Sequence, residues 1–383
     1  MFISGLLATP FRWVGSTILG IDYNYETSGN GSGDNTYAYI SLFINAVLAL
    51  VGTVIWSLLD RHRSNYHKLQ YWFILVLRVF LCLTMLLYGF VKVYQIQFQP
   101  PSLTQLLEPL GNFSPMGLAW TYMGFSKAFG MFAGLLEVTA GCLIIFKRTQ
   151  TLGALLVIGI MTQVAMMNFS FDIPVKIFSV HLILMAMVIA LGDFKRLKAF
   201  FLLNDPTDSF KAYHPKQSER YHTRIPKIKR IVLAILLGIA GIFGYIAQLN
   251  ISGPNKKSQL YGIWKLQPTF SSTDSLHKPN SVFQDWDYVI VELRNEVVVK
   301  TKTDEKLRYS LEIDTSKQRL KLNPYKGTDS LSLSYSHTPK DWLRLELHDN
   351  EESSSMELNY VDPESFTLTS RGFHWINERP FNR

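Results

Sequence analysis

Cysteine is scarce in this sequence: two of the 383 residues are cysteine, Cys82 and Cys142. Both lie in long apolar segments at different predicted depths, so we expect two small packing residues and no disulfide. No C-x-x-C or C-x-x-C-H motif is present, which excludes thioredoxin-like chemistry and covalent haem. No Cys/His cluster has zinc spacing. His181 is the only histidine inside an apolar segment, which excludes a haem held by two membrane histidines, so the chain brings no evident cofactor of its own.

Lysine and arginine are absent from residues 93–126, although the whole chain carries a formal charge of +8. A basic chain can indicate nucleic acid as a partner, but the distribution of charge argues against that here. Residues 251–383 hold 18 Lys and Arg against 19 Asp and Glu, whereas residues 1–250 hold 20 against 11. Fifteen of those 20 basic residues fall in three segments, residues 61–68, 147–148 and 195–230.

These basic segments alternate with non-basic ones between long apolar runs. A membrane-spanning helix needs about 20 apolar residues, and we predict six, at about 38–59, 71–94, 124–146, 151–169, 174–192 and 231–249. Basic loops remain on the cytoplasmic side of a membrane. The pattern therefore predicts a multi-pass protein of a bacterial inner membrane with both termini periplasmic.

The first 20 residues lack the basic start and the cleavage site of a signal peptide and are too interrupted to span. We expect an interfacial segment there, followed by a Gly- and Ser-rich loop. The predicted organisation is an interfacial segment and loop (1–37), a first helix and cytoplasmic loop (38–69), a four-helix core (70–195), a basic cytoplasmic loop (196–230), a sixth helix (231–250) and a periplasmic β domain (251–383).

From Tyr261 onward the apolar pattern takes a period of two, in about nine short runs from YGIWKL to FTLTS. Such runs, separated by Asn, Gly, Pro and Asp, predict an antiparallel barrel or sandwich. Gly262 and Trp264 open the first run and Arg371 follows the last. This resembles the lipocalin-like barrels, in which a late arginine packs on the tryptophan of the first strand, although Trp264 could equally be a simple core residue.

Two charged residues lie deep in the predicted spans. Arg78 is about 10 Å and Glu137 about 15 Å from the cytoplasmic ends of their helices. An isolated charge at such a depth is costly, so we predict an Arg78–Glu137 ion pair inside the bundle. A structural clamp between two helices is at least as good an interpretation of this pair as a functional role.

A second polar group gathers near the outer ends of the spans. Pro174 suits the first turn of a helix, so we expect the fifth span to begin at Asp172 or Ile173 and Asp172 to pair with Lys176. The predicted ligand-binding residues form a pocket with net positive charge that opens outward; they are Lys92, Lys127, Gln163, Asn168, Asp172, Lys176 and His181. Lysines at helix ends can also reach the interface without binding anything.

The segments LRVFLCLTMLLYGFVKV, GLLEVTAGCLIIFKRTQTLG and NFSFDIPVKIFSVHL resemble the DoxX-like membrane proteins, particularly those of Bacteroidota. Arg78, Gly89, Lys92 and Glu137 match the family pattern over about residues 70–195. The resemblance implies a four-helix core, and relatives include subunits linked to quinone reduction. The extra first helix and the β domain depart from the minimal family pattern.

Two functions follow as hypotheses. In the first, the chain is a membrane binding or envelope-assembly module that holds a lipid-like or anionic headgroup and engages an envelope protein through residues 251–383. In the second, it is a quinone-linked oxidoreductase subunit in which His181 donates a proton or hydrogen bond to a quinone and Glu137 relays protons; these two residues are the candidates for a catalytic role.

Overall fold

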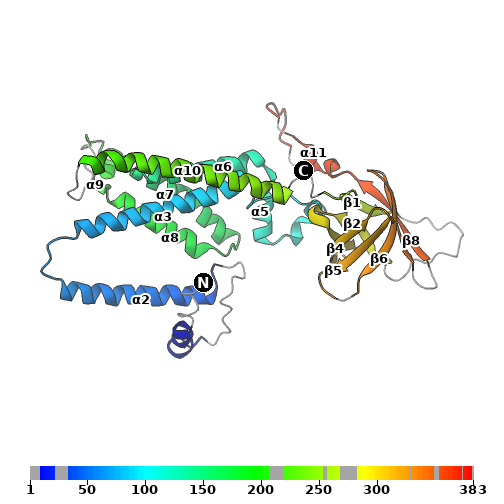
Figure 1. Cartoon of the computed structure of the whole chain (residues 1–383), viewed down its shortest axis with the longest axis horizontal. Coiled ribbons are helices and arrows are strands. Elements are labelled where there is room, and N and C mark those ends of the chain that lie inside the picture. The colour runs from blue at the N-terminus through cyan, green and yellow to red at the C-terminus, as the bar shows by residue number, and fades with distance from the viewer. Residues whose placement is uncertain are drawn as a thin grey trace. The chain divides into compact units, whose positions relative to one another are not determined.

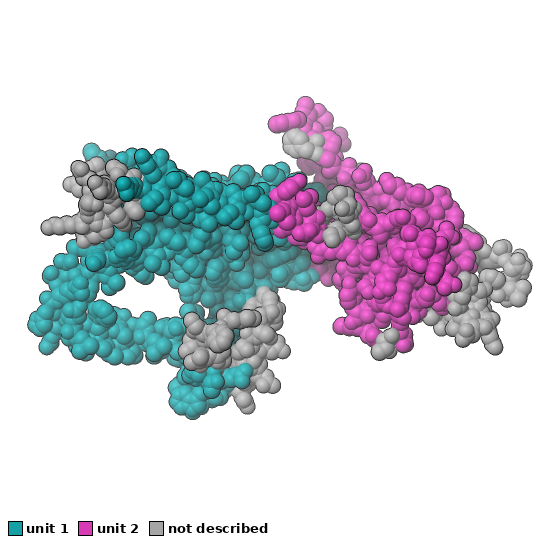
Figure 2. Space-filling view, in the orientation of Figure 1, with its two compact units in different colours: residues 1–98, 114–244 teal, residues 99–113, 245–383 magenta. Residues whose placement is uncertain are grey.

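The computed structural model of the chain describes residues 9–21, 33–207, 219–252, 257–267, 283–327, 329–348, 353–372 and 374–381. Most of the predicted Gly- and Ser-rich loop and the middle of the predicted basic loop lie outside the described residues. The chain divides into two compact units (Figure 2). The first holds residues 1–98 and 114–244, and the second holds residues 99–113 and 245–383.

The first unit is helical (Figure 1). Its elements are η1 (Val14–Ile18), α2 (Thr36–Leu59), α3 (His67–Val93), α5 (Pro115–Phe125), α6 (Lys127–Ile144), α7 (Gln150–Ser170), α8 (Lys176–Leu191), α9 (Phe194–Lys198), η3 (Ala199–Leu203) and α10 (Glu219–Ser252), which continues into the second unit.

Five of these helices are long and apolar enough to cross a membrane: α2, α3, α6, α7 and the part of α10 from Lys227 to Ile251. A sixth is added if α8 counts together with the α9–η3 segment, which bends away from it by 84°. Many of their large apolar side chains face outward, as expected for helices that contact lipid. The chain is therefore a membrane protein. The predicted class, an apolar helical bundle followed by a β domain, is confirmed.

Helices α3, α6, α7 and α8 share one hydrophobic core, to which α10 adds Leu233. Leu81, Met85, Ile144 and Val157 are fully buried there. In contrast, Ile40 is the single buried residue of the 24 that form α2. The core of the bundle is therefore made by the helices of residues 67–191, with α10 packed against them.

The start of α8 differs from the prediction. The helix begins at Lys176, because Asp172 adopts a left-handed conformation with φ of 50° and turns the chain before it. Pro174 therefore precedes the helix. The N–H groups of Lys176 and Ile177, at the start of the helix, donate to the carboxylate of Asp34, at 2.6 and 3.0 Å. Asp34 thus caps a helix that begins 142 residues later.

The second unit contains a closed antiparallel barrel in which each strand pairs with its neighbours in sequence and β1 pairs with β8. Its strands are β1 (Gly262–Leu266), β2 (Trp286–Val291), β3 (Glu296–Thr301), β4 (Lys306–Asp314), β5 (Arg319–Pro324), β6 (Leu331–Thr338), β7 (Trp342–His348) and β8 (Ser353–Val361). The predicted ninth strand, FTLTS, is wrong: residues 367–370 form the short helix α11 (Thr367–Ser370). With β1 and β8 already paired, the sheet has no edge left for it.

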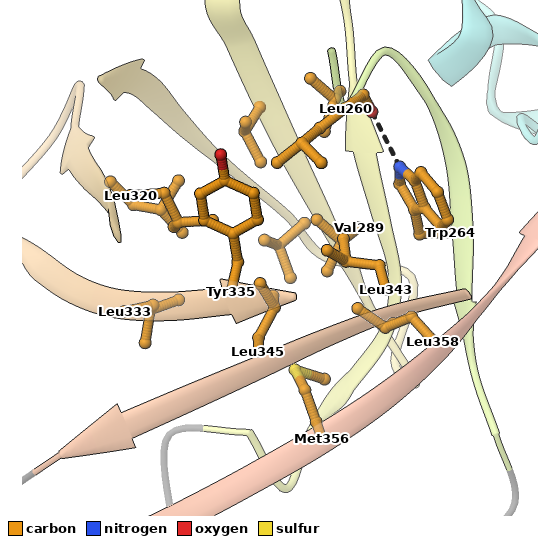
Figure 3. Packing of buried hydrophobic residues seen from close by; sticks show 14 of the residues in the cluster. Leu260, Trp264, Val289, Leu320, Leu333, Tyr335, Leu343, Leu345, Met356 and Leu358 are labelled. Atoms are coloured by element: carbon orange, nitrogen blue, oxygen red, sulfur yellow. Dashed lines mark hydrogen bonds between the residues drawn. The ribbon is translucent and has the colours of Figure 1, made fainter. Parts of the chain in front are cut away.

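Apolar side chains fill the inside of the barrel (Figure 3). Trp264 is buried among them and donates its indole N–H to the carbonyl of Leu260 at 2.9 Å. Its ring packs edge-on against Tyr360. The lipocalin-like expectation for Arg371 is wrong, since its guanidinium lies 4.2 Å from the ring of Phe381 and bonds Asn377.

The segment of residues 99–113, which contains α4 (Leu103–Leu106), packs on the outer surface of this barrel. The backbone and hydroxyl of Thr104 both donate to Glu292, at 2.8 and 2.9 Å. Leu103 covers three outward-pointing strand residues, Ile263, Ile290 and Val298. Both faces of β2 and β3 are therefore buried, which explains why their apolar runs are continuous instead of alternating. The predicted division had placed this segment with the helical core.

Candidate functional site

The helical unit contains a cavity of about 550 Å³ between α3, α5, α6, α7 and α8. Most of its lining is apolar, with methionine and aliphatic side chains on several sides. Six aromatic residues contribute to it: Tyr88, Phe98, Trp120, Phe129, Phe132 and Phe178. An apolar cavity of this size with a few polar groups has the general character of a ligand site.

A close contact between two helices sets up the polar side of the cavity. A Cβ atom on Gly134 would lie 2.5 Å from the carbonyl oxygen of Gly89, and one on Gly89 would lie 2.7 Å from that of Gly134. The absence of both side chains therefore lets α3 and α6 approach backbone to backbone. Lys92 lies one turn after Gly89 on α3, and Glu137 lies one turn after Gly134 on α6. Because the two helices run antiparallel and side chains lean toward the start of their helix, Lys92 and Glu137 lean toward each other.

Lys92 and Glu137 form a buried ion pair, in which the ammonium donates to Glu137 Oε1. Their side chains are 7% and 2% exposed, and both line the cavity. The predicted Arg78–Glu137 pair is therefore wrong. Arg78 lies farther along α3, where it donates to the carbonyls of Ile144 (2.8 Å) and Ile145 at the end of α6.

Two buried oxygen atoms of the cavity lining have no hydrogen-bond partner among the described residues. They are Glu137 Oε2 and Gln97 Oε1. Buried acceptors are nearly always satisfied in folded proteins, because an unmade hydrogen bond leaves the full cost of removing the group from water. Both atoms can accept a hydrogen bond from a molecule in the cavity.

A second polar contact lies between α7 and α8. The amide of Asn168 donates to Ser179 Oγ at 3.1 Å and to the carbonyl of Val175 at 3.3 Å. The hydroxyl of Ser179 in turn donates to the carbonyl of Lys176. Asn168 and Ser179 also line the cavity, so their contact ties the start of α8 to its wall.

The cavity brings together part of the predicted set. Lys92, Gln163 and Asn168 line it, together with Glu137. Lys92 and Glu137 are the charged residues of this lining, so the cavity is formally neutral, whereas the predicted set of residues carried a net positive charge.

The remaining predicted residues do not line this cavity. Lys127 is exposed. Lys176 pairs with Asp172 at 3.1 Å, which confirms that predicted contact. His181 Nδ1 donates to the carbonyl of Ile177 at 2.7 Å within its own helix. The candidate catalytic pair is thus split, with Glu137 on the cavity and His181 away from it.

Sequence reasoning missed Gln97 and the side chains that α5 contributes to the lining, especially Trp120. The segment Pro115–Phe125 looks like the flank of a span in the sequence, and in the structure it is a separate helix that ends where Ser126 caps α6. The useful signal was Ser114-Pro115, a helix start directly after a loop.

The fold and the cavity define a membrane protein with a ligand-sized cavity in its helical bundle and a separate β barrel. A similar protein is the Uncharacterized protein YwoB of Bacillus subtilis (strain 168), which is 30% identical over 132 residues, 34% of this chain and 83% of YwoB. The chain belongs to the family of YwoB. No family model and no solved structure matches the chain.

Proposed function

We propose that the chain is an integral membrane binding module whose helical bundle holds an amphiphilic small molecule beside the Lys92–Glu137 pair. The observation that carries this proposal is an apolar cavity of about 550 Å³ that contains two buried acceptors without partners, Glu137 Oε2 and Gln97 Oε1. We also propose that it is a DoxX-like protein, on the strength of Arg78, Gly89, Lys92 and Glu137.

The chemistry of the lining restricts the ligand. Its apolar and aromatic walls suit a lipid-like body, and its free acceptors suit a head that donates hydrogen bonds, such as a hydroxyl or an amine. An anionic headgroup fits less well, because Glu137 already neutralises Lys92 and a further negative charge would lie beside its carboxylate. We therefore favour a neutral or amine-bearing amphiphile for this cavity.

The distribution of basic residues supports a bacterial inner membrane with both termini and the barrel on the periplasmic side. Because apolar side chains fill the barrel, an envelope protein partner would contact its outer surface. In this proposal the bundle binds the small molecule and the barrel is the part that engages the partner.

A quinone-linked subunit is the second candidate, and the aromatic lining favours it. A planar ring fits between such side chains, Lys92 can donate to a quinone oxygen, and a quinol hydroxyl can donate to Glu137 Oε2. His181 has no part in this version, since it does not line the cavity.

Mild extraction from the native membrane, followed by mass spectrometry and visible absorbance of the bound material, tests both candidates. We expect a stoichiometric amphiphile with a hydroxyl or amine head. The variant Gln97→Leu should lower its occupancy, because it removes one acceptor and leaves the ion pair in place. Gln248→Leu, on α10 and outside the lining, is the matched control and should retain the ligand.

A bound quinone lost in Gln97→Leu or Glu137→Gln would favour the second candidate. The absence of any bound small molecule in the wild-type protein would contradict the cavity as the binding site. Equal ligand occupancy in Gln97→Leu and Gln248→Leu would contradict it as well.

A further inference from the structure

The helical unit has a second cavity, of about 570 Å³, lined by residues of α3, the turn between α6 and α7, the start of α7 and the end of α8. It shares no lining residue with the Lys92–Glu137 cavity. Its polar residues are His67, Gln70, Tyr71, Arg78, Lys147, Gln150 and Asp193.

Arg78 is the unusual member of this lining. It is 2% exposed, and within the described part of the chain no carboxylate lies within ion-pair distance of its guanidinium. Its Nε and one terminal nitrogen donate to the carbonyls of Ile144 and Ile145. A guanidinium carries five N–H donors, so others remain for a further partner. Buried charges are normally paired, because an unpaired one is costly to remove from water.

Two lysines add positive charge beside Arg78. Lys147 lines the same cavity, with its ammonium 4.7 Å from the centre of the Tyr71 ring. Burial and the nearby charge of Arg78 lower the pKa of Lys147. Lys229 of α10 donates to the carbonyl of Ile145 at 3.4 Å, the same carbonyl that Arg78 uses.

Asp193, the acidic residue of the lining, has its hydrogen bonds and ion pair with other residues than Arg78 and Lys147. The carboxylate of Asp193 accepts from the hydroxyl of Thr151 and from Arg196, whose nitrogen lies 3.4 Å away. The lining thus contains two cationic side chains, Arg78 and Lys147, and one carboxylate, that of Asp193, so its formal charge is positive. The rest of its wall is apolar, with Phe73, Ile74, Leu75, Val188 and Leu191.

We infer that this cavity binds a phosphate-bearing anion through Arg78 and Lys147. A guanidinium matches phosphate oxygens geometrically and a lysine adds a point charge, which is the usual donor set for phosphate. The apolar wall suits the acyl chains of an anionic lipid, and basic pockets between membrane helices on the cytoplasmic side recognise such headgroups. Free phosphate has the same chemistry without the chains.

The test uses the full chain in nanodiscs of phosphatidylcholine alone and in nanodiscs where phosphatidylglycerol replaces part of it. We expect phosphatidylglycerol to raise the unfolding temperature and to be retained in native mass spectra. Lys147→Gln should weaken this retention about tenfold, the effect of losing one charge-assisted contact. Lys127→Gln removes the same charge at a residue outside this cavity and should leave retention unchanged.

Inorganic phosphate, titrated into the phosphatidylcholine nanodiscs, separates the two sources of the anion. Stabilisation by phosphate that Lys147→Gln abolishes supports a soluble anion, and stabilisation by phosphatidylglycerol alone supports the lipid. Arg78→Lys keeps the positive charge and should fold, but it loses the planar guanidinium that matches two phosphate oxygens. Retention of phosphatidylglycerol by this variant should therefore also fall. Equal effects of Lys147→Gln and Lys127→Gln, or no response to either anion, would overturn the inference.

Discussion

At the residue scale, the three buried charged residues in the described part of the bundle differ in their partners. Lys92 and Glu137 neutralise each other, whereas Arg78 bonds two carbonyls. Removing one partner of a buried pair leaves an unpaired charge, which is more destabilising than never having had the pair. Lys92 and Glu137 should therefore behave as one unit under mutation, and Arg78 should not.

The prediction is that Lys92→Met and Glu137→Leu each lower the free energy of unfolding by about 3–5 kcal/mol. The double variant should lose less than the sum, because neither charge is then left alone. Chemical unfolding in detergent gives the coupling, expected at about 1–3 kcal/mol. The cycle of Arg78→Gln with Glu137→Gln should be additive; coupling there would mean that the two residues meet after all.

The sequence could identify these charges but not pair them. Counting residues along a helix gives depth, yet it gives neither the rotation of the helix nor its shift against a neighbour. In the structure the Gly89–Gly134 contact sets that shift and places Arg78 beside the end of α6, about two turns beyond Glu137. The Asp172–Lys176 contact was predictable because both residues lie in one short segment.

At the element scale, the approach of α3 to α6 depends on two residues without side chains. Gly134→Ala should lower the unfolding temperature and disturb the Lys92–Glu137 pair, because the new methyl group would lie 2.5 Å from a backbone oxygen. Gly52→Ala, in α2, is the control: nothing lies within 4 Å of its added Cβ. That variant should be stabilised by about 0.5–1 kcal/mol, from helix propensity alone. Equal responses of the two variants would contradict the close contact.

The start of α8 depends on a carboxylate supplied from far away in the sequence. Asp34→Ala should cost about 1–2 kcal/mol, the usual value of a lost helix cap. Asp172→Asn removes the charge of a side chain that is 88% exposed in its ion pair, keeps a residue type that tolerates the left-handed conformation, and should change stability little. Hydrogen exchange should show faster opening at Lys176 and Ile177 in Asp34→Ala alone. No local pattern around Asp34 reveals this role, which is why the sequence predicted that the helix begins at Asp172 or Ile173.

The segment of residues 99–113 buries apolar side chains on the outer surface of the barrel, where they form a second hydrophobic cluster. Leu103→Ala should lower the free energy of unfolding of the barrel by about 2–4 kcal/mol, since it opens a space over Ile263, Ile290 and Val298. Leu110→Ala is the matched control in the same segment, with a side chain that is 72% exposed. Hydrogen exchange of the strand amides at increasing denaturant follows the barrel. A similar loss in both variants would mean that Leu103 is not buried against the strands.

At the scale of the whole molecule, the sequence predicted the order of parts well: a long apolar part, then a strand-rich part that folds as a barrel or a sandwich. Both signals are periodic and local, so they can be read from one chain. The period-two runs predicted β1 to β8, and the pattern failed at FTLTS because closure of the barrel depends on long-range pairing. The cavities depend on side chains from several helices and were predicted only in part.

The orientation of the whole molecule can be tested with two serines that the predicted topology places on opposite sides. Ser64 lies in the loop between α2 and α3, beside Arg61 and Arg63, and Ser330 lies immediately before β6; both are exposed. In a chain with Cys82 and Cys142 replaced by alanine, Ser330→Cys should react with a membrane-impermeant maleimide in spheroplasts. Ser64→Cys should react only after the membrane is permeabilised. This outcome follows because basic loops resist translocation, and the opposite labelling would place the barrel in the cytoplasm.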